Sequence, residues 1–171
     1  MKKLLIVVDY QNDFINGSLG FEGADSIYPF IKEKIQEYEK SGTIIFLKDT
    51  HLPNYLDTME GKHLPIEHCI YDTEGWLMYG DLEEISKKHR VFTKNTFGST
   101  DLFKFLLENS FDYIELVGLV SNICIISNAV LAKTALPNAT IVVDKRGTGS
   151  SDLSLHKQAL SILKNLHIEV K

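Results

Sequence analysis

Cysteine is scarce in this 171-residue chain, which has only Cys69 and Cys124, and no apolar run is long enough to cross a membrane. A disulfide-stabilised secreted domain and a membrane-spanning protein are therefore both disfavoured, since the second needs about 20 consecutive apolar residues. No signal peptide is evident either. We expect a reduced, cytoplasmic protein that does not enter membranes, with a Cys69–Cys124 disulfide as the less favoured alternative.

Basic segments are also lacking. The net charge is -5, and the chain has neither a basic block nor a basic amphipathic helix. Nucleic acid and membrane surfaces are thus poor candidates as partners, and a small molecule is favoured. Internal repeats and linkers are absent, while 44% hydrophobic and 24% charged residues are ordinary for a globular protein. A single domain spanning residues 1–171 is expected.

Apolar segments of strand length alternate with segments of helical periodicity. Strands are predicted at residues 3–9, 43–48, 90–93, 112–118, 139–144 and 167–170. Runs that are apolar on both faces suit parallel strands covered by helices, and parallel neighbours need crossover connections. The pattern predicts an α/β fold with three layers, α/β/α, around a doubly wound, mainly parallel six-stranded sheet.

Helix boundaries are marked by capping residues. Asp25 or Ser26 can begin the first long helix, Ser99 or Thr100 a second, and Asp152 the last. Gly42 ends the first helix, and the segment from 147 to 151 is predicted to be a turn. Side chains expected to face inward are Ile27, Ile31, Ile35 and Tyr38 in the first helix, Leu102, Phe103, Leu106 and Leu107 in the second, and Leu155, Ala159, Leu160 and Leu163 in the last.

Cys124 lies where the apolar strand 112–118 gives way to an apolar helix. Free N–H groups and the dipole at a helix start are expected to lower the pKa of such a thiol and favour the nucleophilic thiolate. Asp9 and Lys94 follow two other strands, so an acid, a base and a nucleophile meet at the carboxyl edge of the sheet. The alternatives are a structural cysteine, a carboxylate that caps a loop and a solvated lysine.

The long irregular stretch from 49 to 80 holds a second group of polar residues. Asp49 and His51 are two apart, so in an extended segment both side chains point to one side, where a loop histidine can complete a metal site. Two imidazoles and a carboxylate suit Zn, Mn or Fe(II). Further candidates are Glu60, His63 and His68, and an ordinary solvated polar loop remains the alternative.

Five motifs, in order along nearly the whole chain, resemble those of the isochorismatase-like cysteine hydrolases. They are Val8-Asp9-Tyr10-Gln11-Asn12-Asp13-Phe14, Asp49-Thr50-His51, Leu64-Pro65-Ile66-Glu67-His68-Cys69, Lys94-Asn95-Thr96-Phe97-Gly98-Ser99 and Gly118-Leu119-Val120-Ser121-Asn122-Ile123-Cys124. Within this superfamily the chain is most similar to nicotinamidases, also called pyrazinamidases. The ordered motifs are specific for the superfamily and less specific for the substrate.

The resemblance implies a catalytic triad of Asp9, Lys94 and Cys124. It also implies an oxyanion hole formed by the N–H groups of Val120 and Cys124, with a cis peptide bond between Leu119 and Val120. Attack of the thiol on a small amide would give a thioester and ammonia, and hydrolysis would then release the free acid.

For the metal, the resemblance implies Asp49, His51 and His68 as ligands, with Glu60 as a possible fourth, and His63 could replace His68 if the loop is registered differently. A divalent ion, zinc first with manganese or iron as alternatives, would orient the substrate. Phe14 resembles the aromatic residue that packs on the substrate ring.

Nicotinamide and pyrazinamide are the substrates that this likeness implies, and relatives often form dimers or tetramers. Pro65 departs from the family pattern, which has an aromatic residue there, and Glu67 is an extra residue before His68. Both departures leave two alternatives open. One is another small amide, a ureido compound or a vinyl ether as substrate, and the other is a catalytically silent binding domain.

Overall fold

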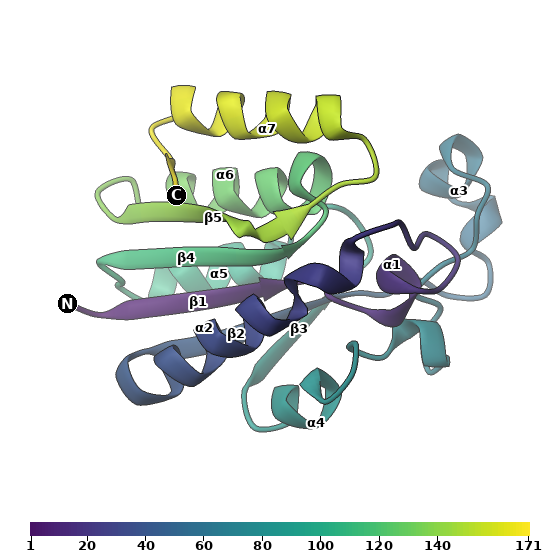
Figure 1. Ribbon diagram of the computed structural model, residues 1–171, viewed down its shortest axis with the longest axis horizontal. Coiled ribbons are helices and arrows are strands. Elements are labelled where there is room, and N and C mark those ends of the chain that lie inside the picture. Colours follow the sequence, from purple (N-terminus) through teal and green to yellow (C-terminus); the bar gives the residue numbers. More distant parts are fainter.

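Six parallel strands form one sheet in the order β3-β2-β1-β4-β5-β6, in a computed structural model that describes residues 1–171 (Figure 1). The strands are β1 (Lys3–Val8), β2 (Thr43–Asp49), β3 (Arg90–Lys94), β4 (Tyr113–Leu119), β5 (Thr140–Gly149) and β6 (Glu169–Val170). Every neighbouring pair is parallel. The predicted doubly wound α/β sheet is confirmed, and all six predicted strands are present.

Helices cover both faces of the sheet. The α-helices are α1 (Asn12–Ile15), α2 (Tyr28–Ser41), α3 (Met59–His63), α4 (Leu82–Ser86), α5 (Thr100–Glu108), α6 (Ile126–Ala135) and α7 (Leu153–Asn165). Shorter helical turns lie at Ala24–Ile27 (η1), Tyr55–Asp57 (η2), Glu74–Trp76 (η3) and Ser121–Ile125 (η4). None of the helices combines the length and the apolar character that a membrane span requires.

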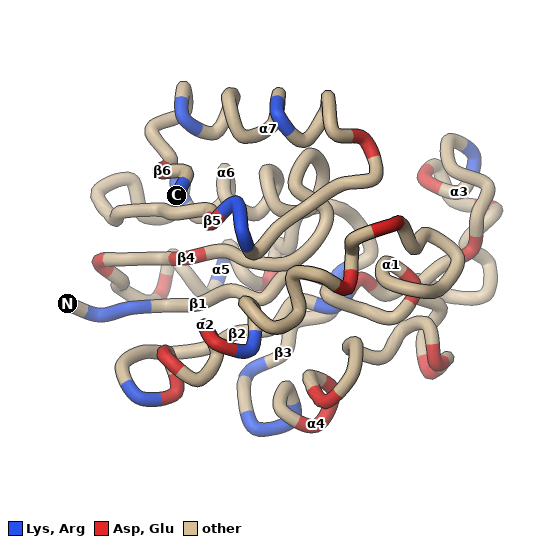
Figure 2. The backbone as a smooth tube through the Cα atoms, viewed as in Figure 1, with Lys and Arg blue, Asp and Glu red and all other residues tan.

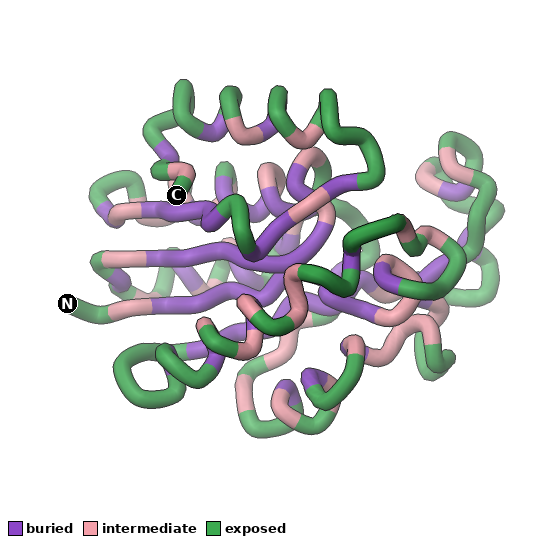
Figure 3. Tube along the Cα trace, viewed as in Figure 1, coloured by how far each residue is buried: buried purple, intermediate pink, exposed green.

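Two hydrophobic cores flank the central strand β1, because its side chains alternate between the faces of the sheet. Leu4, Ile6 and Val8 pack in the core formed with α5, α6 and α7. Leu5 and Val7 pack in the opposite core, beneath α2 and α4. Figure 3 shows the central strands β1, β2 and β4 largely buried and much of the outward side of the helices exposed.

The chain changes direction across the sheet at β1. From β1 it proceeds to β2 and β3 on one side, and then crosses to β4 on the other. The carboxyl ends of β1 and β4 therefore lie side by side, with Val8 paired to Gly118. An opening forms at such a switch point, which is where doubly wound sheets bind ligands.

Acidic and basic residues are interspersed along the helices and loops, with no continuous basic stripe (Figure 2).

Most predicted helix boundaries are confirmed. The Ser99 hydroxyl accepts the Leu102 N–H at 3.1 Å, and the Asp152 carboxylate accepts the N–H groups of Ser154 and Leu155 at 2.8 and 2.9 Å. The prediction for α2 is wrong, because the turn η1 leads directly into this helix. Asp25 and Ser26 lie inside that turn, and neither side chain caps α2.

Two inward-facing assignments need correction. Leu107 is 60% exposed, since it follows Leu102 by five residues, which places it about 140° around the helix. Leu155 is also exposed, at 43%; it lies in the first turn of α7, whose buried residues are Ala159 and Leu163.

The predicted turn at 147–151 is in part a strand. β5 continues to Gly149 after a register shift opposite Leu116 and Gly118. A Cβ on Gly147 would lie 2.7 Å from the Val117 side chain and 3.0 Å from the Phe30 ring. Glycine at this position therefore permits close packing of β5 against β4 and α2.

Candidate active site

Four neighbouring strands deliver their terminal side chains to one edge of the sheet. Asp9 follows β1, Asp49 ends β2, Lys94 ends β3, and Cys124 lies in η4 just after β4. Asp49 and Lys94 are direct partners in the sheet register. The predicted convergence is present, and all four residues are buried.

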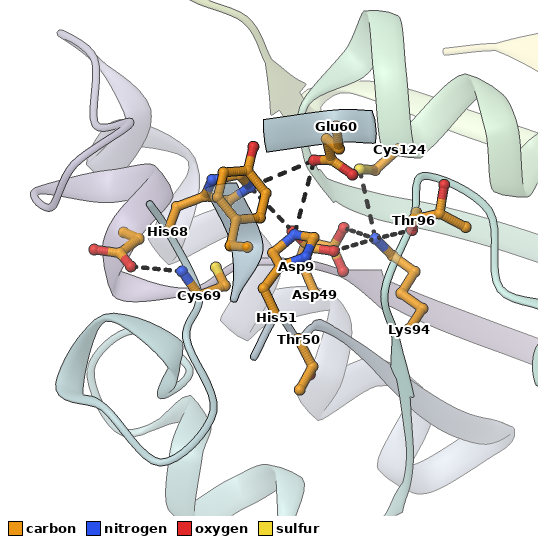
Figure 4. A network of polar contacts seen from close by, with 12 residues as sticks. Asp9, Asp49, Thr50, His51, Glu60, His68, Cys69, Lys94, Thr96 and Cys124 are labelled. Atoms are coloured by element: carbon orange, nitrogen blue, oxygen red, sulfur yellow. Dashed lines mark hydrogen bonds and ion pairs between the residues drawn. The ribbon is translucent and has the colours of Figure 1, made fainter. Parts of the chain in front are cut away.

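Lys94 is at the centre of this arrangement (Figure 4). Its Nζ lies 2.6 Å from Asp9 Oδ2, 3.3 Å from Asp49 Oδ1 and 3.6 Å from Cys124 Sγ, and it donates to the Thr96 carbonyl at 3.0 Å. Burial disfavours the charged ammonium, but the carboxylates of Asp9 and Asp49 outweigh burial and raise the pKa of Lys94. The side chain therefore keeps its positive charge inside the protein.

Asp9 is fully buried and has a left-handed backbone conformation, with φ of 46°. Such a conformation is uncommon outside glycine and is found at sites where a side chain must be aimed. Burial raises the pKa of Asp9 to about 6, although the Lys94 ammonium acts in the opposite direction. The carboxylate is thus a stronger base than an exposed aspartate, yet it is ionised at neutral pH.

The expected lowering of the thiol pKa is wrong. Burial raises the pKa of Cys124, and the Asp9 carboxylate adds to this effect, while only Lys94 among its neighbours acts against it. The helix-start effect does not prevail because the thiol is only 6% exposed. Cys124 is therefore a neutral thiol until a base removes its proton. Both cysteines are free, which excludes the Cys69–Cys124 disulfide in this structure.

Asp49, His51, Glu60 and His68 form a group in which one ligand atom from each residue lies within 4.8 Å of the others. Asp49 Oδ2 is 3.0 Å from His51 Nε2 and 3.4 Å from His68 Nε2, and Glu60 Oε1 is 3.7 Å from both imidazoles. Tetrahedral ligands about 2.0 to 2.2 Å from zinc lie roughly 3.3 to 3.6 Å from one another. The spacing of the group is thus suitable for a divalent metal ion.

The orientation of His68 also suits a ligand. Its Nδ1 lies 2.8 Å from the Ile66 carbonyl, and donation to that oxygen leaves the lone pair of Nε2 directed at the group. Burial raises the pKa of Asp49, but hydrogen bonds from His51 and His68 in their Nε2-protonated forms, together with the Lys94 ammonium, outweigh burial and lower that pKa. A bound ion would take the place of those Nε2 protons. An ionised carboxylate is the form that binds a metal ion.

The structure separates the two candidate loop histidines. His63 is exposed on α3, and its Nδ1 lies 2.8 Å from the Met59 carbonyl. It lies outside the four-residue group, to which His68 contributes. Pro65 and Glu67 are exposed and do not line the cavity beside Cys124, where Leu64 forms that part of the wall.

A cavity of about 240 Å³ opens beside the thiol. Cys124 and Val120 line this cavity, and so do Asp49, Glu60 and His68. The candidate nucleophile and three of the candidate metal ligands therefore face one space. Most of the remaining wall is apolar and consists of Phe14, Leu19, Phe21, Leu64, Phe97 and Ile123. The cavity therefore suits a small, largely apolar molecule with a polar end.

Phe14 lies in this cavity wall, a position compatible with the role that the family resemblance implies for it. Its ring contacts the His68 ring edge-on, with 5.7 Å between the ring centroids. The side chain can pack on a ring held near the metal group.

The segment after β4 contains the cis peptide bond between Leu119 and Val120 that the family resemblance implies. The N–H of Val120 donates no hydrogen bond within the protein, and Val120 lines the cavity next to Cys124. This N–H is available to a ligand. Ser121, the next residue, is buried, and its Oγ lies 2.8 Å from Nδ1 of His156 in α7.

Several positioning residues were not identified from the sequence, although two lie in the first motif. The Gln11 side chain accepts the Asp49 N–H at 2.7 Å and donates to the Asp49 carbonyl at 2.8 Å. The Asp13 carboxylate accepts the N–H of Cys69 at 2.7 Å and so holds the segment that carries His68. Tyr55 is fully buried against the rings of both His51 and His68. Only the polar character of Gln11 and Asp13 beside Asp9 gave any signal of these roles.

Residues 3–170 match the family model described as the isochorismatase domain. A Bacillus subtilis protein, described as an uncharacterized isochorismatase family protein PncA, is 32% identical over 178 residues, covering 96% of each chain. A crystal structure of nicotinamidase/pyrazinamidase PncA from Bacillus subtilis matches with a TM-score of 0.88 and 31% identity, covering 99% of each chain.

Two further relatives are more distant. A nicotinamidase of Acinetobacter baylyi is 25% identical over 171 residues, covering 82% of this chain and 78% of the relative. The pyrazinamidase of Pyrococcus horikoshii, solved in complex with zinc, matches with a TM-score of 0.86 and 24% identity, covering 100% of this chain and 99% of that chain. The last likeness supports the fold alone.

Proposed function

The chain belongs to the isochorismatase family, and from this membership and the geometry of its site we propose that it hydrolyses nicotinamide, and analogues such as pyrazinamide, to the free acid and ammonia. The observation that carries the proposal is the single cavity lined by both Cys124 and the Asp49, Glu60 and His68 donors. A thiol beside Asp9 and Lys94 supplies acyl-transfer chemistry, and the donors supply a means to hold the substrate.

In the proposed reaction, Asp9 first accepts the proton of the Cys124 thiol. Its raised pKa suits this transfer, and the Lys94 ammonium stabilises the thiolate that forms 3.6 Å away. Sulfur attacks the amide carbon, and the carbonyl oxygen gains negative charge. The N–H groups of Val120 and Cys124 receive that charge, and each such donor can lower the barrier by about 3 to 4 kcal/mol.

Collapse of the tetrahedral intermediate breaks the C–N bond. Asp9 returns its proton to the departing nitrogen, so that ammonia leaves and the acyl group remains on sulfur as a thioester. Asp9 then takes a proton from water, which attacks the thioester. The free acid departs, and the thiol regains its proton.

Asp49, His51 and His68 are the proposed ligands of a divalent metal ion, with Glu60 as the fourth. Zinc is the first choice because two imidazoles and carboxylate oxygens at tetrahedral spacing suit it, and manganese or iron are alternatives. When bound, the ion supplies a Lewis-acid contact for a ring nitrogen of the substrate. Phe14 then packs against the ring, and Cys124 faces the amide.

Ammonia release from nicotinamide tests the proposal. Purified protein supplied with zinc, manganese or iron should release ammonia, and Cys124→Ala should abolish release while its far-UV spectrum remains that of the folded protein. Iodoacetamide should modify Cys124 and leave Cys69 unmodified, because Cys69 is fully buried and lines no major cavity. A panel of other small primary amides identifies the substrate class. No ammonia release with any of the three metals would refute the nicotinamidase assignment.

A further inference from the structure

The four-residue metal group is a wall between two cavities. On one side is the cavity of about 240 Å³ beside Cys124, which contacts Asp49, Glu60 and His68. On the other side a second cavity, of about 410 Å³, contacts His51 and Glu60. Glu60 is the only member of the group that lines both cavities.

The two cavities differ in their chemistry. Apolar side chains dominate the cavity beside Cys124, and eight of its twelve lining residues are hydrophobic. In the second cavity, only three of ten lining residues are hydrophobic. Its hydroxyl and amide groups come from Thr50, Asn54, Thr58, Asn95 and Thr96.

The second cavity also reaches the surface. Asn54, Thr58, Asn95 and Thr96 are exposed, whereas His51 at its inner end is only 5% exposed. A polar path therefore leads from solvent to the imidazole of His51. It runs between the segment 50–60 and the loop that follows β3.

A divalent cation in water carries a tightly held hydration shell. Passage across an apolar wall removes that water without replacement, which is costly, whereas hydroxyl and amide oxygens can replace water ligands one at a time. We infer that the second cavity is the route by which a divalent cation and its water ligands reach His51 and Glu60, separately from the substrate cavity. This inference rests on the metal group of the proposed function.

A consequence is that metal and substrate enter through separate cavities. The cation can load or exchange while a molecule occupies the cavity beside Cys124. Blocking the second cavity should slow both loading and release of the ion, and the equilibrium constant should change little because a route affects both directions equally.

Metal-loading kinetics test the route. The full-length chain is stripped of metal by chelation, and Co²⁺ binding is followed by stopped-flow absorbance, without substrate. Asn95→Trp narrows the second cavity, and Asn95 makes no side-chain hydrogen bond that the change would remove. Loading should slow at least about tenfold, while the Co²⁺ dissociation constant changes by less than about twofold.

Two matched variants and one chemical block complete the design. Leu19→Trp fills the cavity beside Cys124, and alkylation of Cys124 with a benzyl group does the same. Asn138→Trp places the same bulk on an exposed loop between α6 and β5. All three should load Co²⁺ within about twofold of the unmodified rate.

Three results would each overturn the inference. They are slower Co²⁺ loading after Leu19→Trp or alkylation of Cys124, an unchanged loading rate in Asn95→Trp, and no saturable Co²⁺ binding. Ammonia release from nicotinamide, measured on the same unmodified preparation, keeps the two proposals distinct. If the unmodified protein loads Co²⁺ normally and releases no ammonia, the nicotinamidase assignment alone is refuted. If the unmodified protein releases ammonia and Asn95→Trp loads Co²⁺ at the unchanged rate, the route alone is refuted.

Discussion

The buried carboxylate of Asp9 has opposite effects on activity and on stability. Burial raises its pKa to about 6, so the folded protein holds the Asp9 proton more tightly than the unfolded chain does. The stability that this group contributes is complete below the ordinary aspartate pKa, and it is lost as the pH rises through about 6. The ionised form, which the proposed reaction uses as its base, is therefore the form that folding favours least.

The pH dependence of ammonia release follows from the raised pKa of Asp9. We expect kcat/KM for nicotinamide to be constant above neutral pH and to fall about tenfold per pH unit below about 6, as Asp9 becomes protonated. The measurement is made at saturating metal from pH 5 to 8, and thermal unfolding over the same range serves as control. A profile that stays flat down to pH 5 would contradict the raised pKa of Asp9.

Gly118 is a second single residue on which the site depends. Its φ is 117°, and a Cβ at this position would lie 1.9 Å from the Val8 carbonyl oxygen, directly before Asp9. We expect Gly118→Ala to lower the free energy of unfolding by about 3 kcal/mol or more, since backbone strain and a backbone clash are combined. Urea denaturation measures this loss.

Gly23 offers a matched control for Gly118. Its φ is 85°, but a Cβ there would meet only the Ser26 hydroxyl, at 3.9 Å. Gly23→Ala should therefore cost only about 1 kcal/mol, which is the conformational part alone. Equal losses in the two variants would contradict the close approach between β1 and β4.

Asn128 connects two separate elements of the site. This buried side chain in α6 donates to the carbonyls of Cys124 and Phe97 at 2.8 and 3.0 Å, and it accepts the Ser99 N–H at 2.9 Å. Through these bonds, the turn that carries the thiol is fixed to the loop between β3 and α5. Lys94 is the last residue of β3, directly before that loop.

Removal of the Asn128 amide leaves three backbone groups without this partner. Asn128→Ala should lower the free energy of unfolding by roughly 3 kcal/mol or more, because each buried group left unpaired costs about 1 to 3 kcal/mol. Asn109→Ala is the control, since Asn109 makes one hydrogen bond, to the Phe105 carbonyl, and should lose only about 1 kcal/mol. Similar losses would show that the Asn128 connection contributes little.

The elements were predictable to different degrees, for physical reasons. Strand β1 is a continuous apolar run, and Ser99 and Asp152 are capping residues whose chemistry is local, so sequence suffices for both. Leu107 was misassigned because apolar character alone does not place a side chain in the core. Gly147 was assigned to a turn because its close contacts with Val117 and Phe30 come from distant segments.

In the site, too, some features were predictable from the sequence and others depend on contacts between distant segments. Convergence of Asp9, Asp49 and Lys94 was predictable because parallel strands end at one edge of the sheet. The choice of His68 over His63 was made from the family motif, and it is consistent with the anchoring of the loop by Asp13. The pKa of Cys124 could not be predicted, since it depends on burial and on the distance to Asp9, neither of which is a local property.

The metal group joins parts of the molecule that the sheet alone does not hold together. Asp49 belongs to β2, Glu60 to α3 and His68 to the loop anchored by Asp13, so a bound ion would crosslink all three segments. An ion that binds only the folded state stabilises it by about 2.7 kcal/mol at a free concentration one hundred times its dissociation constant. The whole chain should therefore unfold at a higher temperature with metal than without it.

We expect chelation to lower the unfolding temperature by roughly 5 to 10 °C and added zinc to restore it, as differential scanning calorimetry would measure. His51→Ala should abolish this zinc-dependent shift, because it removes one of the four ligand atoms. His63→Ala should keep the full shift, because the exposed His63 lies outside the group. If the zinc-dependent shift is lost in His63→Ala and kept in His51→Ala, the ion binds elsewhere. The substrate cavity would then lack the proposed metal contact that holds the ring.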